Sequence, residues 1–412
     1  MVLESPVSLQ GLFLVMAAST LVVVALGAAR RLTVPSVVGE ILIGIVIGPS
    51  MLGWVHPQDW VIRVLANFGM AYLLFVAGLE LDLRALRHRR LSVLLLGYAL
   101  TLALAFVATW TLHAAGLGAS PLFVTIAISA SALGVLTPVL KERGLLEDEF
   151  GQIVFCACVI AEVMPITLLS IFYATDHDTP LQQVGRVLGI ALLASLVAAF
   201  MAWSAGSRWM NERFPPDERP TTQVRIRQTM LILIGLVVAA HGVGVEVILG
   251  ALAAGVVVGA VRRRNGRTAA YYGKIEAMGF GLFIPVFFVS VGMCFDLGSL
   301  TSSVSSLVKV PLYLALLLLA RGLPAVLAYG RIMTLPERVA AGFFQATNLS
   351  FIAAATATGL RLGKIGVADA SALVAAGMLS VVAFPQVAGM IAGRSAAAET
   401  PKSGGRAIGS KA

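Results

Sequence analysis

Two charged residues lie deep inside apolar segments of the 412-residue chain, where a charge needs a specific reason. Glu162 stands in the middle of the apolar run 148–173, and Arg321 stands inside LLLLARGLPAVL. A carboxylate at the centre of a bilayer costs roughly 2.5 to 3.5 kcal/mol, so its presence there marks a functional site by default. Such a group can bind either a proton or a cation. Competition between the two for Glu162 is sufficient for exchange.

Arg321 is too deep for its side chain to reach either surface, and it therefore needs a partner. Two are available. One is Glu162, in a simple structural ion pair. The other is the carbonyl end of a half-helix, where partial negative charge gathers.

Two apolar segments carry short polar interruptions that would create such half-helices. SASALGVLTP at 129–138 contains Ser129 and Ser131, and QATNLS at 345–350 contains Thr347 and Asn348. Single Ser and Thr residues often only bond the preceding helical turn. Paired interruptions in matched helices instead point to a binding site at the middle of the membrane. Their oxygen atoms are the ligands that a hard cation needs when it sheds water.

Other polar residues in apolar segments have simpler interpretations. Cys158 lies one helical turn before Glu162, where it either lines the site or is a buried inert thiol. Glu40 is expected to make a structural hydrogen bond at the inner end of its helix. No CxxC pair, zinc-ligand spacing, HExxH or Ser/His/Asp arrangement stands out in the sequence. We therefore expect neither an enzyme nor a resident cofactor or metal.

The composition defines the elements that must position these residues. Hydrophobic residues make up 58% of the chain and charged residues only 12%, which excludes an ordinary soluble protein. Apolar runs bounded by charges, Pro and Gly predict an all-α polytopic membrane protein with thirteen transmembrane helices. We place them at 8–29, 34–52, 60–79, 91–116, 121–141, 148–173, 183–211, 224–241, 245–262, 272–295, 303–331, 336–360 and 367–393.

The net charge of +9 has a topological explanation and does not require nucleic acid as a partner. With the N-terminus outside, 24 of the 30 Lys and Arg residues fall on the inner side, the side of the C-terminus. The odd helix count suits two inverted six-helix repeats, 8–173 and 224–393, joined by a linking helix at 183–211. The interrupted helices are then the fifth and the twelfth, seven apart. Residues 394–412 are expected to form a short polar cytoplasmic tail, with no regulatory domain.

Several sequence motifs resemble those of the monovalent cation:proton antiporters, in the branch that holds bacterial sodium/proton exchangers and the transporter domains of potassium efflux systems. The similarity extends over nearly all of residues 8–393. The motifs are VPSVVGEILIGIVIGPSMLG (34–53), MAYLLFVAGLELD (70–82), ISASALGVLTPVLKERG (128–144), GQIVFCACVIAE (151–162), VILGALAAGVVVG (247–259) and IPVFFVSVGMCFDL (284–297).

This resemblance implies a membrane domain over 1–393 with a dimer domain and a core domain, in which broken helices five and twelve cross beside the ion site. It also implies a homodimer in the inner membrane of a bacterium. The essential acid of the family falls on Glu162, and the polar residue that usually precedes it falls on Ala161. The basic residue of the eleventh helix falls on Arg321. Both positions of the pair depart from the usual pattern, where Asp is common at the second.

With Ala161 unable to titrate, one carboxylate remains, so exchange of one proton for one Na⁺ or K⁺ would move no net charge. We expect an electroneutral antiporter that works by alternating access. The cation ligands would come from Glu162, Cys158, Ser129, Ser131, Thr347 and Asn348, with Arg321 compensating charge. Two alternatives remain open. One is a symporter of an organic anion with sodium on a related fold, and the other is a non-transporting sensor on the same scaffold.

Overall fold

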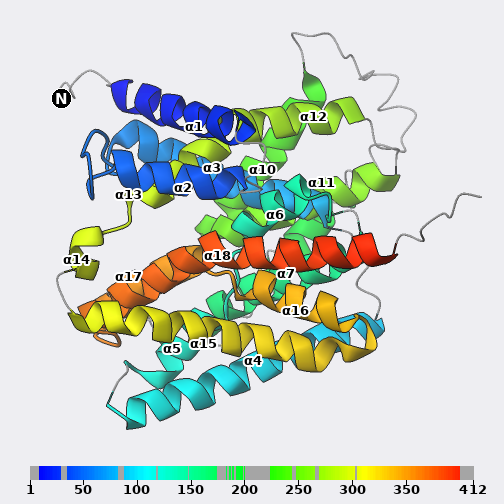
Figure 1. Ribbon diagram of the computed structural model, residues 1–412. Coiled ribbons are helices and arrows are strands. Elements are labelled where there is room, and N and C mark those ends of the chain that lie inside the picture. Colours follow the sequence, from blue (N-terminus) through cyan, green and yellow to red (C-terminus); the bar gives the residue numbers. More distant parts are fainter. Residues whose placement is uncertain are drawn as a thin grey trace, which may run out of the picture.

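The computed structural model describes residues 9–28, 35–81, 88–116, 119–146, 148–173, 223–243, 247–264, 269–301 and 304–399, with scattered positions between 182 and 199. Within these residues every regular element is a helix (Figure 1). The first half contains α1 (Gln10–Ala28), α2 (Ser36–Ile47), α3 (Trp60–Glu80), α4 (His88–Ala114), α5 (Pro121–Ser129), α6 (Leu133–Glu142) and α7 (Glu149–Tyr173). The second half contains α10 (Val224–Gly242), α11 (Val247–Arg264), α12 (Ala269–Met278), η1 (Gly279–Phe283), α13 (Ile284–Met293), α14 (Leu297–Thr301), α15 (Val304–Ala328), η2 (Tyr329–Arg331), α16 (Leu335–Ala346), α17 (Ser350–Arg361) and α18 (Val367–Glu399).

The predicted polytopic helical fold is confirmed. Among the described residues, ten spans are long and apolar enough to cross a membrane, and α2 and α11 supply two shorter apolar helices. Twelve of the thirteen predicted helices therefore have a counterpart. The predicted linking helix at 183–211 lies mostly outside the described residues.

Two predicted helices differ from the observed ones for local reasons. The second helix was predicted to reach residue 52, but α2 ends at Ile47, and Gly48 is extended with its N–H bonded to the carbonyl of Gly44. The chain then turns, and Gly53 adopts a left-handed conformation with φ of +62° that favours glycine. The predicted helix 272–295 is continuous through a π-helical turn, η1, which joins α12 to α13.

Both predicted interruptions are real breaks in their helices. Residues 130–132 separate α5 from α6, and residues 347–349 separate α16 from α17. Non-helical backbone is tolerated at membrane depth only where protein covers it and satisfies its polar groups. Here the covering is complete, since Ser131, Thr347 and Asn348 are at most 1% exposed.

The helices form two groups, which lie above and below the centre in Figure 1. In the group that we call the panel, α2 packs on α13, α3 packs on α11 and α13, α1 packs on α2, and α10 packs on α11. In the group that we call the bundle, α15 packs on α4, α16 and α18, while α5, α6 and α16 contact α7. Helix α6 belongs to the bundle through α7 and also contacts α2 and α3 of the panel.

Glycines allow the closest helix contacts inside the panel. A Cβ atom at Gly44 of α2 would lie 2.2 Å from the carbonyl oxygen of Val289, and one at Gly292 of α13 would lie 2.0 Å from that of Ile41. The crossing of α3 and α11 repeats this arrangement. A Cβ at Gly255 would lie 2.0 Å from the carbonyl oxygen of Phe75. Small residues at these crossings bring backbone directly against backbone, as expected for helices in a membrane.

Candidate functional site

The two breaks cross and bond to one another at the centre of the bundle. The N–H of Ala132, in the first break, donates to the carbonyl oxygen of Thr347, in the second, at 2.8 Å. The N–H of Ser131 donates to the carbonyl oxygen of Ala161 on α7 at 3.2 Å. These bonds satisfy main-chain groups that the interrupted helices leave open. They also fix both breaks beside the middle of α7.

Glu162 lies at this crossing and is 4% exposed. Its Oε2 accepts a hydrogen bond from the N–H of Leu133, the first residue of α6, at 3.3 Å. The N-terminus of a helix carries partial positive charge, so α6 directs its favourable end at the carboxylate. A buried anion is thereby stabilised without a fixed cation beside it.

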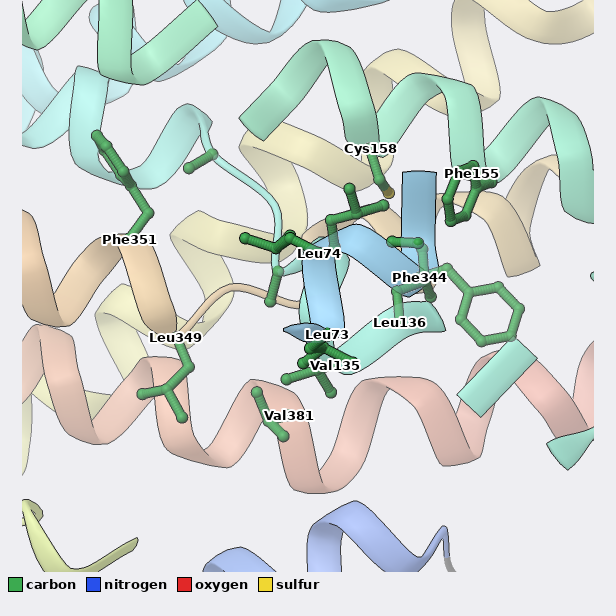
Figure 2. Close-up of a cluster of buried hydrophobic side chains, with 14 of the residues drawn as sticks. Leu73, Leu74, Val135, Leu136, Phe155, Cys158, Phe344, Leu349, Phe351 and Val381 are labelled. Carbon is green, nitrogen blue, oxygen red and sulfur yellow. The ribbon is translucent and has the colours of Figure 1, made fainter. Parts of the chain in front are cut away.

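Cys158, one helical turn before Glu162 on the same face of α7, meets Ser131. The Ser131 hydroxyl lies 3.2 Å from the Cys158 sulfur, as donor, and 3.5 Å from the Thr347 carbonyl oxygen. Cys158 is fully buried, within a cluster that includes Leu136, Phe155 and Phe344 (Figure 2). A small set of polar atoms is therefore enclosed by apolar side chains.

Asn348 holds the second break against the first half-helix. Its Nδ2 donates to the carbonyl oxygen of Ala127 on α5 at 3.0 Å, and its main-chain N–H donates to the Ser380 hydroxyl on α18 at 3.1 Å. The amide oxygen Oδ1 is buried and has no hydrogen-bond partner. An unpaired buried acceptor is costly, so this oxygen is available to a ligand.

Arg321 is 1% exposed and takes the second of its two predicted partners. Its Nε donates to the main-chain carbonyl oxygen of Gln345, near the C-terminal end of α16, at 3.2 Å. The ion pairs of the described residues do not include Arg321 with Glu162. The alternative of a simple structural pair is therefore wrong. The C-terminal end of α16 carries partial negative charge and compensates the guanidinium.

Two of the predicted cation ligands make local or peripheral bonds instead. The Ser129 hydroxyl bonds the carbonyl oxygen of Ile126 at 2.9 Å and lies 3.2 Å from the Tyr98 hydroxyl. The Thr347 hydroxyl bonds the carbonyl of Phe343, one turn earlier, at 3.3 Å. Of these two residues, only the main-chain carbonyl of Thr347 reaches the crossing.

The sequence reasoning missed several polar groups around Arg321. Tyr329 donates from its hydroxyl to the side chain of Gln345 at 3.2 Å, and the Arg321 guanidinium lies 5.9 Å from the centre of the Tyr98 ring. The sequence signal that could have identified them is the presence of Tyr and Gln residues inside apolar spans. Gln345 is the first residue of QATNLS at 345–350.

Among the described residues Glu40 is the second deeply buried carboxylate, and it lies in the panel, away from the crossing. Its Oε1 accepts a hydrogen bond from the Ser19 hydroxyl on α1 at 2.9 Å. The bond joins α1 to α2 inside the panel. Glu40 therefore has a local partner of its own.

A helical membrane fold with two broken helices crossing beside a buried carboxylate is typical of secondary transporters. Comparison with solved structures shows a shared fold. The fold is similar to that of the sodium proton antiporter MjNhaP1 from Methanocaldococcus jannaschii, with a TM-score of 0.69 and 14% identity over 95% of this chain and 98% of that one.

The chain belongs to the sodium/hydrogen exchanger family, whose transmembrane model matches residues 17–392. It is 27% identical to YjbQ of Bacillus subtilis over 376 residues, which cover 86% of this chain and 58% of YjbQ. It is also 27% identical to a Na⁺/H⁺ antiporter of Enterococcus hirae over 289 residues, which cover 67% of this chain and 71% of the relative. The match thus spans little more than half the length of the first relative.

Proposed function

We propose that this chain is a secondary active antiporter that exchanges Na⁺ or K⁺ for H⁺ across a membrane. The observation that carries the proposal is the placement of Glu162, a buried carboxylate without an ion-pair partner among the described residues, at the crossing of two broken helices. The family and the name of the Enterococcus hirae relative support the same activity.

Glu162 binds either a proton or a cation in this mechanism. The unpaired Oδ1 of Asn348 is a candidate oxygen ligand for the cation. The carbonyl oxygens of Ala161 and Thr347 and the Ser131 hydroxyl lie at the same crossing and can supply further ligands. Cys158 lines this site as the partner of Ser131.

Coupling follows from the cost of moving a bare charge. When Glu162 is ionised and has no bound cation, its charge is buried away from water. Burial of an uncompensated charge is strongly unfavourable. The bundle therefore exposes the site to the opposite side of the membrane only when Glu162 carries a proton or a cation. In either form, the carboxylate and its bound ion have no net charge. Arg321 stays paired with the α16 carbonyl end throughout. Exchange of one proton for one monovalent cation is electroneutral.

The two inverted repeats have support in the helix contacts. In the predicted order of helices, such a repeat relates each helix to the one seven places later. It relates α2, the second helix, to α11, the ninth, and α3, the third, to the tenth, which contains α13. The crossing of α2 with α13 then corresponds to the crossing of α11 with α3, and close glycines occur in both. We accordingly assign the panel as the fixed domain and the bundle as the moving one. We further propose a homodimer with the C-terminus on the cytoplasmic side of a bacterial inner membrane.

The test is reconstitution of the chain in sealed vesicles that hold an imposed proton gradient. Addition of Na⁺ or K⁺ should dissipate the gradient, as followed with an internal pH dye. Collapse of the membrane potential with an ionophore should leave the rate unchanged. Failure of Na⁺, K⁺ and Li⁺ alike to dissipate the gradient would reject antiport. A rate that depends on the potential would reject the electroneutral stoichiometry alone.

A further inference from the structure

The panel and the bundle are joined by polar side chains at the C-terminal end of α6. Lys141 donates from Nζ to Oε1 of Glu80, at the end of α3, at 3.3 Å, and it also forms an ion pair with Glu276 of α12. The next residue, Glu142, accepts a hydrogen bond from the hydroxyl of Ser36, the first residue of α2. We call these five residues the α6 clasp.

The same turn of α6 is fastened to the bundle by the residue that follows. Arg143 donates from Nη2 to the side-chain oxygen of Gln386 on α18 at 2.9 Å. Gly144 then ends the helix in a left-handed conformation with φ of +68°. The end of α6 is therefore bonded to α18 of the bundle. Lys141 and Glu142 reach from that end to α2, α3 and α12.

Apolar side chains also pack between α3 and α6. Leu73 and Leu74 of α3 belong to one buried cluster with Val135 and Leu136 of α6 (Figure 2). A Cβ at Gly134 would lie 3.0 Å from a methyl carbon of Leu73. Apolar contacts are non-directional and can be remade in a shifted position. Hydrogen bonds and ion pairs depend on distance and angle, so the α6 clasp cannot survive the same shift.

We infer that the α6 clasp holds the panel and the bundle together at one membrane face and must open in each transport cycle. This inference rests on the proposed antiport. With the clasp closed, Lys141 and Glu142 tie α2, α3 and α12 to α6 and keep the site shut on that side. Movement of the bundle separates Lys141 from Glu80 and Glu276, and Glu142 from Ser36, while Arg143 stays with Gln386.

Reversible cross-linking tests this inference in the full chain. Cysteines replace Ser36 and Glu142 in a Cys294→Ser background, since Cys156 and Cys158 are buried and Cys294 is exposed. A short bis-thiosulfonate linker joins the two cysteines in reconstituted vesicles, and dithiothreitol releases them. The linked protein should exchange at least about ten-fold more slowly than the same protein after release, because alternating access requires the two groups to separate.

The matched control is the pair Arg143→Cys and Gln386→Cys, at the same face but within the bundle. Its linked form should exchange within about two-fold of its released form, because neither residue leaves the other during the cycle. If Ser36→Cys with Glu142→Cys does not fold, Glu80→Cys with Lys141→Cys tests the same contact.

A linked clasp that exchanges as fast as its released form overturns the inference, and so does a control pair that is inhibited equally. Loss of exchange in the wild-type chain and in every released variant instead rejects the proposed antiport itself. The two failures are therefore distinguishable.

Discussion

The Nε atom of Arg321 donates to the main-chain carbonyl oxygen of Gln345 at 3.2 Å, while Glu162 accepts from the N–H of Leu133 at 3.3 Å. Each of the two deep charges is thus compensated by a helix end of opposite polarity. The negative end of α16 meets the guanidinium, and the positive end of α6 meets the carboxylate. Among the described residues no charged side chain pairs with the carboxylate, as the proposed binding of a proton or a cation requires.

Replacement of Glu162 by Gln should abolish exchange while the protein remains folded. The amide is isosteric but cannot carry a proton or balance a cation, so the rate of cation-driven pH change should fall by at least about two orders of magnitude. The matched control is Glu40→Gln, since Glu40 is equally buried but bonds Ser19 within the panel. Wild-type rates in Glu162→Gln would move the site elsewhere.

Replacement of Arg321 by Gln should destabilise the protein independently of Glu162. The change removes a charged hydrogen bond to the end of α16, which is worth about 2 kcal/mol of unfolding free energy. Denaturation in detergent measures this loss in the wild-type and in the Glu162→Gln background. The two values should agree within about 0.5 kcal/mol. A rescue of Arg321→Gln by Glu162→Gln would reveal a direct pair and contradict the geometry.

Replacement of Asn348 by Leu should weaken cation binding. It removes the unpaired Oδ1 and the bond from Nδ2 to Ala127, and we expect the KM for the cation to rise about ten-fold. Thr356→Val is the control, because that buried hydroxyl on α17 bonds only main-chain carbonyls of its own helix, those of Ile352 and Ala353. An unchanged KM in Asn348→Leu would remove this residue from the ligand set.

Alanine at Gly292 or Gly255 should lower the stability of the panel. Each new Cβ would lie 2.0 Å from a carbonyl oxygen of the facing helix, an overlap that costs about 1 to 3 kcal/mol. Gly235→Ala on α10 is the control, since its Cβ meets nothing within 4 Å. There the change should be neutral or stabilising by up to about 1 kcal/mol. Equal melting temperatures for all three variants would contradict close packing at the crossings.

The positions of the breaks were predictable because polar residues in apolar spans have a clear signature. Ser131, Asn348 and Glu162 all lie at the crossing that the pairing of the two interruptions predicts. The partner of Arg321 could only be narrowed to two options, since the choice depends on how α15 lies against α16. Main-chain ligands such as the carbonyls of Ala161 and Thr347 leave no residue-type signal, so only the three-dimensional arrangement identifies them.

The α6 clasp could not be predicted from the sequence, for a related reason. In the sequence, Lys141 is only one of the many cations that the charge distribution places on the inner side of the membrane. Its partners Glu80 and Glu276 are 61 and 135 positions away in the chain. Only the packing of α6 against the panel brings the three together, and no local pattern encodes that packing.

The glycine crossings of α2 with α13 and of α3 with α11 also determine which motions are open to the molecule. Where a carbonyl oxygen sits directly against the Cα of a facing glycine, axial sliding of one helix would drive that oxygen into the next side chain. Shear within the panel is therefore opposed at two separate points, where Gly44 faces Gly292 and where Gly255 faces Gly78, whose own Cβ would lie 2.4 Å from the carbonyl oxygen of Leu252. In the mechanism that we propose, the panel therefore stays rigid while the bundle carries the ion site past it.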